Sequence, residues 1–520
     1  MFKISGYSRF LTPAQFVLFN LALGIGHFLV LLNAGAYLPM LPYVTGSMDE
    51  GLPYVVWGQS DYFTALGCAF LIARPLMKRF GPKVTVIASF LLFSFASLGA
   101  LFVVHNLILF TSFRVVQGFA AGLGIIPSFF LLLEYYKTER QPAATALWGL
   151  AVFIPFSVGP ALGGWFAYVL GDWRLLFFAS FLISLVIAGI LWGLLADWED
   201  VIDRSYPLLD QSLTFGLFFA SALMFQEFFD VGLLSDLSSR FKELWGMLFL
   251  TLTGFALFQI RNARSKNPLF SFSLFSHRNF GVGTLLFCLS FMLLQGGIVQ
   301  YIIRFQLVEG YTAWHVGLLF LPLFIFSKPF SLLTQNRIQN GWDPRIPASL
   351  SLLAIALNFW WISSYLRPAT WELLLLPQLL LGAAIGPFFS SMTTLALGHV
   401  PKSQQLNALD LLNGARNIGA GLAITFSDIG WDRLQAHQWN LFTTPDPSNS
   451  LRFLSFSPID SHTAHTELER VAGLLTFNDF FQLLAWGTLL FSCLVWFLTP
   501  PRTHLPDPDL IILENLGEEP

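Results

Sequence analysis

Fourteen apolar stretches, each long enough to cross a lipid bilayer, occupy most of this 520-residue chain. A hydrocarbon core about 30 Å thick requires roughly 20 helical residues, because an α-helix rises 1.5 Å per residue. Only 11% of the residues are charged, whereas soluble domains have about 25%. The sequence therefore predicts an all-α integral membrane protein. The predicted spans are 16–42, 53–77, 84–105, 107–133, 143–170, 175–196, 208–229, 244–261, 280–303, 313–335, 346–366, 372–398, 405–430 and 478–499.

The distribution of lysine and arginine predicts how these spans are oriented. With the amino terminus in the cytoplasm, the inner loops contain twice as many basic residues as the outer loops, which is the bias that sets orientation in membranes. An even number of spans returns the carboxyl terminus to the same side. We therefore expect a multi-pass protein of the cytoplasmic (inner) membrane with both termini inside.

The sequence indicates neither a metal site nor a nucleotide site. His462 and His465 have no cysteine or carboxylate pattern around them, although zinc sites need further ligands of those types. No glycine-rich phosphate loop is present, which argues against an ATP-driven pump. No nucleophile–base set is visible either. We expect no metal, no cofactor, no enzymatic activity and no binding of nucleic acid.

Two similar basic turns lie at corresponding places in the two halves of the chain. Lys78, Arg79 and Gly81 lie between the second and third spans, and residues 336–345 lie between the tenth and eleventh. Such pairs indicate an internal repeat, on which many transporters are built. We expect the first turn to be a cytoplasmic gating loop. The alternative is that both turns only fix the orientation of neighbouring spans.

Polar residues within the spans are candidates for a transport path. Arg114 and Gln117 lie in the fourth span, Gln378 in the twelfth and Arg416 in the thirteenth. An arginine in the bilayer should face a cavity or a carboxylate, because its guanidinium stays charged. We therefore expect Gln117, Gln378 and Arg416 to line a cavity. For Arg114, a purely architectural buried pair is the alternative.

The fifth span is dense in small residues, with Gly159, Pro160, Gly163 and Gly164. In lipid, small residues allow helices to approach closely, and a proline permits a kink. This span is therefore predicted to pack tightly against a neighbour. The contact would either take part in conformational coupling or be a seam without such a role.

In this order, the motifs resemble the major facilitator superfamily, specifically the fourteen-helix drug:proton antiporters of the EmrB/QacA kind. The positions that are similar to family motifs are the turn at 78–81, Arg114, Gln117, Gly118, the run from Gly159 to Gly164, Gln226, Asp230, Gly232, Asp236, Pro377, Gln378, Arg416 and residues 478–481.

The resemblance implies the major facilitator fold with 14 transmembrane helices. Residues 1–200 would form an N-terminal six-helix bundle, residues 201–275 two inserted helices, and residues 276–520 a C-terminal six-helix bundle. A polar loop at about 431–477 would then face outward. By resemblance to EmrB, this loop would dock a periplasmic adaptor protein that works with an outer-membrane channel. The alternative is a surface loop without a partner.

One position departs from the family pattern. Relatives have an aspartate in the first span that is thought to couple protons, and Asn33, which cannot titrate, occupies that place. Helical rise puts Asp61 and Arg114 at a depth similar to that of Asn33. Asp61 is therefore the candidate substitute acid, held by the charge of Arg114, or else an acid wetted by the outer vestibule. Asp410 shares a second depth with Lys328. The two would form a structural pair, or Asp410 would be the next candidate acid for proton coupling.

Together these observations predict a secondary exporter of small hydrophobic or amphipathic compounds, of the multidrug efflux type. Proton antiport by alternating access would drive it. One alternative is an exporter dedicated to a single metabolite such as a siderophore or a fatty acid. Another is a non-transporting membrane receptor or scaffold, which Asn33 favours, whereas Arg114 and the intact Gly159–Gly164 run count against it.

Overall fold

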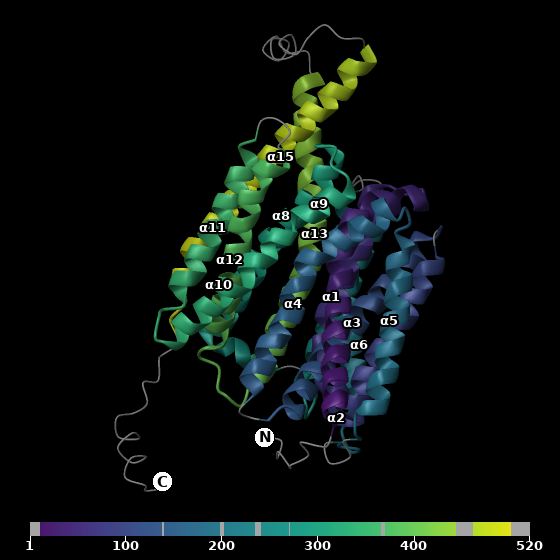
Figure 1. The fold of residues 1–520 in the computed structure, drawn as a ribbon, viewed down its shortest axis with the longest axis vertical. Coiled ribbons are helices and arrows are strands. Elements are labelled where there is room, and N and C mark those ends of the chain that lie inside the picture. Colours follow the sequence, from purple (N-terminus) through teal and green to yellow (C-terminus); the bar gives the residue numbers. More distant parts are fainter. Residues whose placement is uncertain are drawn as a thin grey trace.

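The computed structural model consists of long helices that lie side by side (Figure 1). It describes residues 11–103, 105–137, 140–197, 202–234, 241–269, 271–365, 370–443 and 461–500. The elements are α1 (Pro13–Met48), α2 (Leu52–Phe102), α3 (Leu107–Tyr135), α4 (Gln141–Gly164), η2 (Trp165–Val169), α5 (Arg174–Leu194), α6 (Leu208–Leu234), α7 (Phe241–Arg264), η4 (Phe272–Ser276), α8 (Arg278–Leu307), α9 (Ala313–Leu319), α10 (Leu321–Gln339), α11 (Arg345–Ser363), α12 (Trp371–Leu397), α13 (Gln405–Thr443), α15 (Ser461–Leu494) and η5 (Val495–Phe497).

The predicted spans all fall on helices of the structure, which confirms the all-α class. Within the described residues, 11 helices are long and apolar enough to cross a membrane. Helix α2 covers two predicted spans, whereas α4 and α13 are not among the 11. The exact number of 14 spans therefore stays a prediction.

Helix α1 has a capped N-terminus and two prolines in its interior. Thr12 caps its first turn by accepting a hydrogen bond from the backbone of Gln15, whose side chain accepts one in return, and Pro13 opens the helix. This reciprocal capping satisfies backbone N–H groups that have no partner inside the helix. Pro39 and Pro42 lie within the same helix. Neighbouring helices compensate for such prolines in a membrane protein.

The predicted turn at 78–81 interrupts α2. Gly81 has φ 83° and ψ 160°, a backbone conformation that side chains disfavour and glycine adopts easily. The turn rests on the segment that follows α5: the ammonium of Lys83 lies 3.0 Å from a carboxylate oxygen of Asp197. The ammonium of Lys78 lies 5.3 Å from the ring centre of Tyr206. The turn therefore packs against the segment between α5 and α6.

The prediction of one long outer loop at about 431–477 is wrong for much of that segment. Helix α13 continues to Thr443, and α15 begins at Ser461, so both extend past the other helices in Figure 1. A helix satisfies its own backbone hydrogen bonds and can therefore leave the bilayer without a partner. The polar composition of the segment predicted a loop, but polar residues also occur in helices that extend out of the bilayer. Residues 444–460 lie outside the described part of the chain.

Of the two predicted inserted helices, α6 contacts both halves of the protein. Helix α7 packs on α6, and α6 packs on α2 of the first half and on α13 of the second. Helix α2 also contacts α13 directly. The domain boundaries at residues 200 and 275 stay a prediction. The position of α6 matters for the polar groups described below.

Candidate functional site

A cavity of about 520 Å³ lies between helices of the two halves. Side chains of α1, α2, α3 and α4 line one side of it, and side chains of α8, α10, α12 and α13 line the other, with Phe320 at the α9–α10 junction. Most of the wall is apolar, for example Phe63, Leu294 and Ile385. Pockets for drug-sized molecules have about 300–1,000 Å³ and a mostly apolar lining. The cavity therefore has the size and chemistry of a small-molecule site.

Within the part of the chain that the structure describes, Arg416 is the one lysine or arginine in the lining of this cavity, and the lining contains no aspartate or glutamate. Its guanidinium carbon lies 5.0 Å from the ring centre of Phe389, 5.4 Å from that of Phe291 and 5.9 Å from that of Phe287. Its Nε has no hydrogen-bond partner within the described residues. Arg416 thus lies on the cavity wall, and its role in transport stays a prediction.

The other two predicted cavity residues do not line it. Gln117 and Gln378 are both fully buried and absent from the wall. Gln117 belongs to a polar network inside the first half, and Gln378 lies beside Tyr301. The prediction was wrong for both, because position on a span does not say which neighbour a polar side chain faces.

Arg114 lies at the centre of a satisfied network. Its Nε donates to the carbonyl of Gly58 at 3.1 Å, Nη1 to Gln117 Oε1 at 2.6 Å and Nη2 to Gln59 Oε1 at 2.8 Å. Its guanidinium carbon lies 4.5 Å from the ring centre of Tyr37 and 4.4 Å from that of Tyr62. Arg114 is therefore an architectural residue, held by neutral acceptors and aromatic rings.

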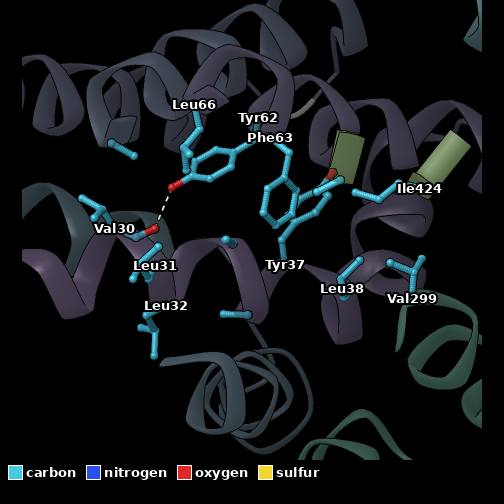
Figure 2. Close-up of a cluster of buried hydrophobic side chains, with 14 of the residues drawn as sticks. Val30, Leu31, Leu32, Tyr37, Leu38, Tyr62, Phe63, Leu66, Val299 and Ile424 are labelled. Atoms are coloured by element: carbon cyan, nitrogen blue, oxygen red, sulfur yellow. Dashed lines mark hydrogen bonds between the residues drawn. The ribbon is translucent and has the colours of Figure 1, made fainter. Parts of the chain in front are cut away.

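The surroundings of Arg114 tie α1, α2 and α5 together. Tyr62 donates from its hydroxyl to the carbonyl of Val30 at 2.6 Å, as Figure 2 shows. Asn33 donates to Ser180 at 2.9 Å and to the carbonyl of Leu29 at 3.1 Å. Asn33 is thus held by hydrogen bonds within the first half, and Gln117 donates to its Oδ1 at 3.5 Å.

Asp61 is not paired with Arg114, so the predicted pairing is wrong. Asp61 is 1% exposed and shares a hydrogen bond with Glu227 on α6. One turn further on, Asp230 accepts hydrogen bonds from Ser60 at 3.2 Å and from Thr425 on α13. Three carboxyl groups therefore lie at the junction of α2, α6 and α13.

Sequence reasoning missed Glu227 and noted Asp230 only as part of a family-like pattern. The spacing of Glu227 and Asp230 places them on neighbouring positions of one helix face. That spacing was the available sequence signal. The spacing does not say which helix these two residues face, and only the structure shows that. Asp236, the last residue of that pattern, lies outside the described residues.

Asp410 forms an ion pair with Arg74 rather than the predicted one with Lys328. Both oxygens of Asp410 accept hydrogen bonds from the guanidinium of Arg74. The pair joins α2 of the first half to α13 of the second. The prediction failed because shared depth does not place two residues on facing helices. A second such pair, Arg304 with Asp428 at 3.2 Å, lies within the second half.

The glycines of the fifth span lie in two close contacts. A Cβ atom added to Gly163 would overlap the carbonyl of Ala36 on α1, and one added to Gly164 would overlap the carbonyl of Ala313 on α9. Gly317 of α9 approaches Pro160 in return. The predicted close packing is therefore present. Gly163 joins two helices of the first half, whereas Gly164 joins the first half to the second.

The chain belongs to the major facilitator superfamily, whose family model matches residues 23–424. Among its relatives is the multidrug export protein EmrB of Haemophilus influenzae, which is 27% identical over 496 residues, covering 93% of this chain and 96% of the relative. The fatty acid resistance protein FarB of Neisseria gonorrhoeae is 28% identical over 419 residues, covering 80% of this chain and 81% of the relative. The crystal structure of a D-xylose-proton symporter has the same fold, with a TM-score of 0.61 at 12% identity, covering 94% of this chain and 99% of the symporter.

Proposed function

We propose that this chain is a secondary exporter of small hydrophobic or amphipathic compounds, located in the cytoplasmic (inner) membrane. The observation that carries the proposal is the apolar cavity of about 520 Å³ between the two halves. The names of two relatives, multidrug export protein EmrB of Haemophilus influenzae and of Escherichia coli, support an efflux role. A transport role rather than catalysis fits a site whose walls come from many helices.

We further propose that transport is coupled to protons by the carboxyl groups at the junction of α2, α6 and α13. A buried carboxylate requires a partner or a proton, and Asp61 hydrogen-bonds to another carboxyl group. Because α13 belongs to the second half, proton binding there would act on a contact between the halves. Asp61 and Glu227 are the proposed proton carriers. Each charge that crosses 100 mV supplies about 2.3 kcal/mol.

The other predicted coupling residues receive different roles in this proposal. Arg114 and Asn33 hold the helices of the first half together through their hydrogen bonds. The Arg74–Asp410 ion pair joins α2 to α13, so it would open and close with the two halves. Alternating access would break this pair in one state and re-form it in the other. The turn at Lys78, Arg79 and Gly81 would act as the gating loop beside it.

The close contact of Gly164 with α9 supports alternating access as well. Rigid-body rotation of two halves about an interface is one of the known kinds of switching transition. Glycine at this position permits that approach, because a side chain would overlap the facing carbonyl. We propose that the contact closes one side of the cavity in this state of the protein.

The experiment that tests the proposal measures transport in everted membrane vesicles. Vesicles with the wild-type protein should accumulate the lipophilic dye Hoechst 33342, or another probe of a hydrophobic panel, when a proton gradient is imposed. Collapse of the gradient by an ionophore should abolish accumulation. Vesicles with the Gly164→Leu variant provide the control. Gradient-independent accumulation, or none with any probe of the panel, would contradict the proposal.

One alternative is supported by a specific relative. The name of FarB, a fatty acid resistance protein, favours the reading that this chain exports one class of metabolite rather than many drugs. Efflux of fatty acids without efflux of unrelated lipophilic dyes would select this alternative.

The resemblance to EmrB also leads us to propose a periplasmic adaptor protein and an outer-membrane channel as partners. Helix α13 extends past residue 430, and α15 begins well before residue 478. These two helical extensions provide a protruding surface, which supports the proposal. Replacement of residues 449–466 by a short glycine–serine linker should reduce efflux from whole cells and leave transport in vesicles unchanged. Unchanged whole-cell efflux would exclude docking at this segment.

A further inference from the structure

We infer that the cavity selects anionic amphipathic substrates, and that Arg416 on α13 binds their negatively charged group. This inference rests on the proposed transport function and names its substrate class. The relevant site is the apolar wall around one guanidinium, contributed by α8, α12 and α13.

The charge of the cavity wall is the first argument. Among the described residues, Arg416 is the one member of the lining with a permanent charge, and no carboxylate of the lining balances it. A charge in a weakly polar environment requires a counter-charge or hydrogen bonds to offset the cost of removing it from water. An anionic group of a substrate would supply both. A cationic substrate would instead be repelled.

The unused hydrogen bonds of Arg416 are the second argument. The rings of Phe287, Phe291 and Phe389 lie around the guanidinium at 5.0–5.9 Å, and such contacts stabilise the positive charge. Ring faces do not replace strong acceptors for the N–H groups at the edge of the guanidinium plane. Nε has no partner, and within the described residues no hydrogen bond or ion pair of Arg416 is formed. The planar fork of N–H groups is suited to a carboxylate or sulfonate.

Two other buried arginines of this protein do have hydrogen-bond or ion-pair partners. Arg114 uses Nε, Nη1 and Nη2 in hydrogen bonds, and Arg304 has the carboxylate of Asp428 at 3.2 Å. Arg114 and Arg304 thus have acceptors for their guanidinium groups. Arg416 lines the cavity, and its guanidinium has no acceptor among the described residues.

The apolar part of the cavity accounts for the rest of the substrate. Phe63 and Phe70 of α2 and Leu294, Ile298 and Ile302 of α8 lie along the wall. Burial of an apolar group against them contributes about 25 cal/mol per Å² of surface removed from water. The combination of one cation and a long apolar wall fits an acid that carries an aromatic or alkyl body.

The test compares three probes with the same body and different charge: 1-pyrenebutanoate, 1-pyrenebutanol and 1-pyrenebutylamine. Binding is measured at pH 7 with the purified full-length protein in lipid nanodiscs, and binding to empty nanodiscs is subtracted. The wild type should bind the acid at least about tenfold more tightly than the alcohol, because a hydrogen-bonded charged group contributes about that much. The amine should bind most weakly.

Two variants isolate the role of Arg416. Arg416→Gln should weaken binding of the acid about 10- to 100-fold and change binding of the alcohol less than about twofold. Arg416→Lys should restore part of the preference, because the charge is kept while the fork is lost. Lys402→Gln removes an exposed positive charge of the same half and should leave all three affinities unchanged.

A third variant keeps Arg416 and removes the effect of its charge. Asn413 lines the cavity one helical turn before Arg416, so Asn413→Asp would place a carboxylate beside the guanidinium. The acid should then lose its preference, and the amine should bind more tightly. This variant remains informative even where Arg416→Gln reduces the yield of folded protein.

Three results would overturn the inference: equal binding of acid and alcohol to the wild type, unchanged binding of the acid to Arg416→Gln, or an equal loss of acid and alcohol in that variant. The last would mean that Arg416 only shapes the cavity. A charge preference without proton-dependent export in vesicles would contradict the proposed function and leave the inference standing. Proton-dependent export with no charge preference would contradict the inference alone.

Discussion

Two arginines inside the helices of this protein both lie against aromatic rings, but only one of them has hydrogen-bond acceptors among the described residues. Arg114 lies between Tyr37 and Tyr62 and donates to three acceptors. Arg416 lies among phenylalanine rings, and its Nε has no partner. The first arginine completes the packing of the N-terminal helices. The second is a charged group on the wall of the cavity.

The difference separates a packed region from a binding region. In the packed region, polar groups satisfy one another and helices touch through glycines, so a change there should act on folding. In the cavity, side chains face open space, so a change there should act on ligands and leave stability nearly intact. Four variants test this separation.

The largest effect is expected for Gly163→Leu. A side chain at this position would overlap the carbonyl of Ala36, and backbone overlap cannot be relieved by a rotamer change. The cost should exceed the roughly 1–3 kcal/mol of ordinary overpacking. Export should be lost, and folded protein in size-exclusion chromatography should fall strongly. Gly189→Leu on α5 is the control, because an added Cβ there meets nothing within 4 Å. Normal export by Gly163→Leu would remove the packing argument.

A smaller but clear effect is expected for Arg114→Leu. The change leaves Gln59 and Gln117 without their donor inside the first half, and each unsatisfied buried group costs about 1–3 kcal/mol. Thermal unfolding in detergent should therefore move to lower temperature. The affinity of the remaining folded protein for pyrenebutanoate should not change. Unaltered stability would mean that the network is not architectural.

Asp61→Asn should act on coupling with little effect on stability. The amide keeps the size of the carboxyl group and can still hydrogen-bond to Glu227, but it cannot carry a proton. Proton-driven export in everted vesicles should be lost, and substrate binding should remain. The external-pH dependence of export in Glu227→Gln provides a second measurement. Full proton-dependent transport by Asp61→Asn would eliminate Asp61 and make Asp410 the next candidate.

The smallest effect on stability is expected for Arg416→Gln. Since Arg416 forms no hydrogen bond or ion pair within the described residues, its removal should change the free energy of unfolding by less than about 1 kcal/mol. Chemical or thermal unfolding of the purified variant in detergent measures this change. A loss as large as that of Arg114→Leu would erase the distinction between the two regions.

The class, the spans and the close packing of the fifth span were predictable because they depend on local properties. Apolar length sets a membrane span, and glycine at Gly81, Gly163 and Gly164 permits a turn or a close approach wherever its neighbour lies. The outer segment was mispredicted, since a polar sequence forms a protruding helix as readily as a loop.

The partners of buried charges were decided only by the tertiary structure. The position of each residue within its predicted span gave Asp61 a bilayer depth similar to that of Arg114, and Asp410 one similar to that of Lys328. It did not give the direction in which each side chain points. The fold turned Asp61 toward Glu227 and Asp410 toward Arg74. It left Arg416 on the cavity wall. Helical periodicity gives a residue its height and relative face, whereas the facing helix is set by packing between segments far apart in the chain.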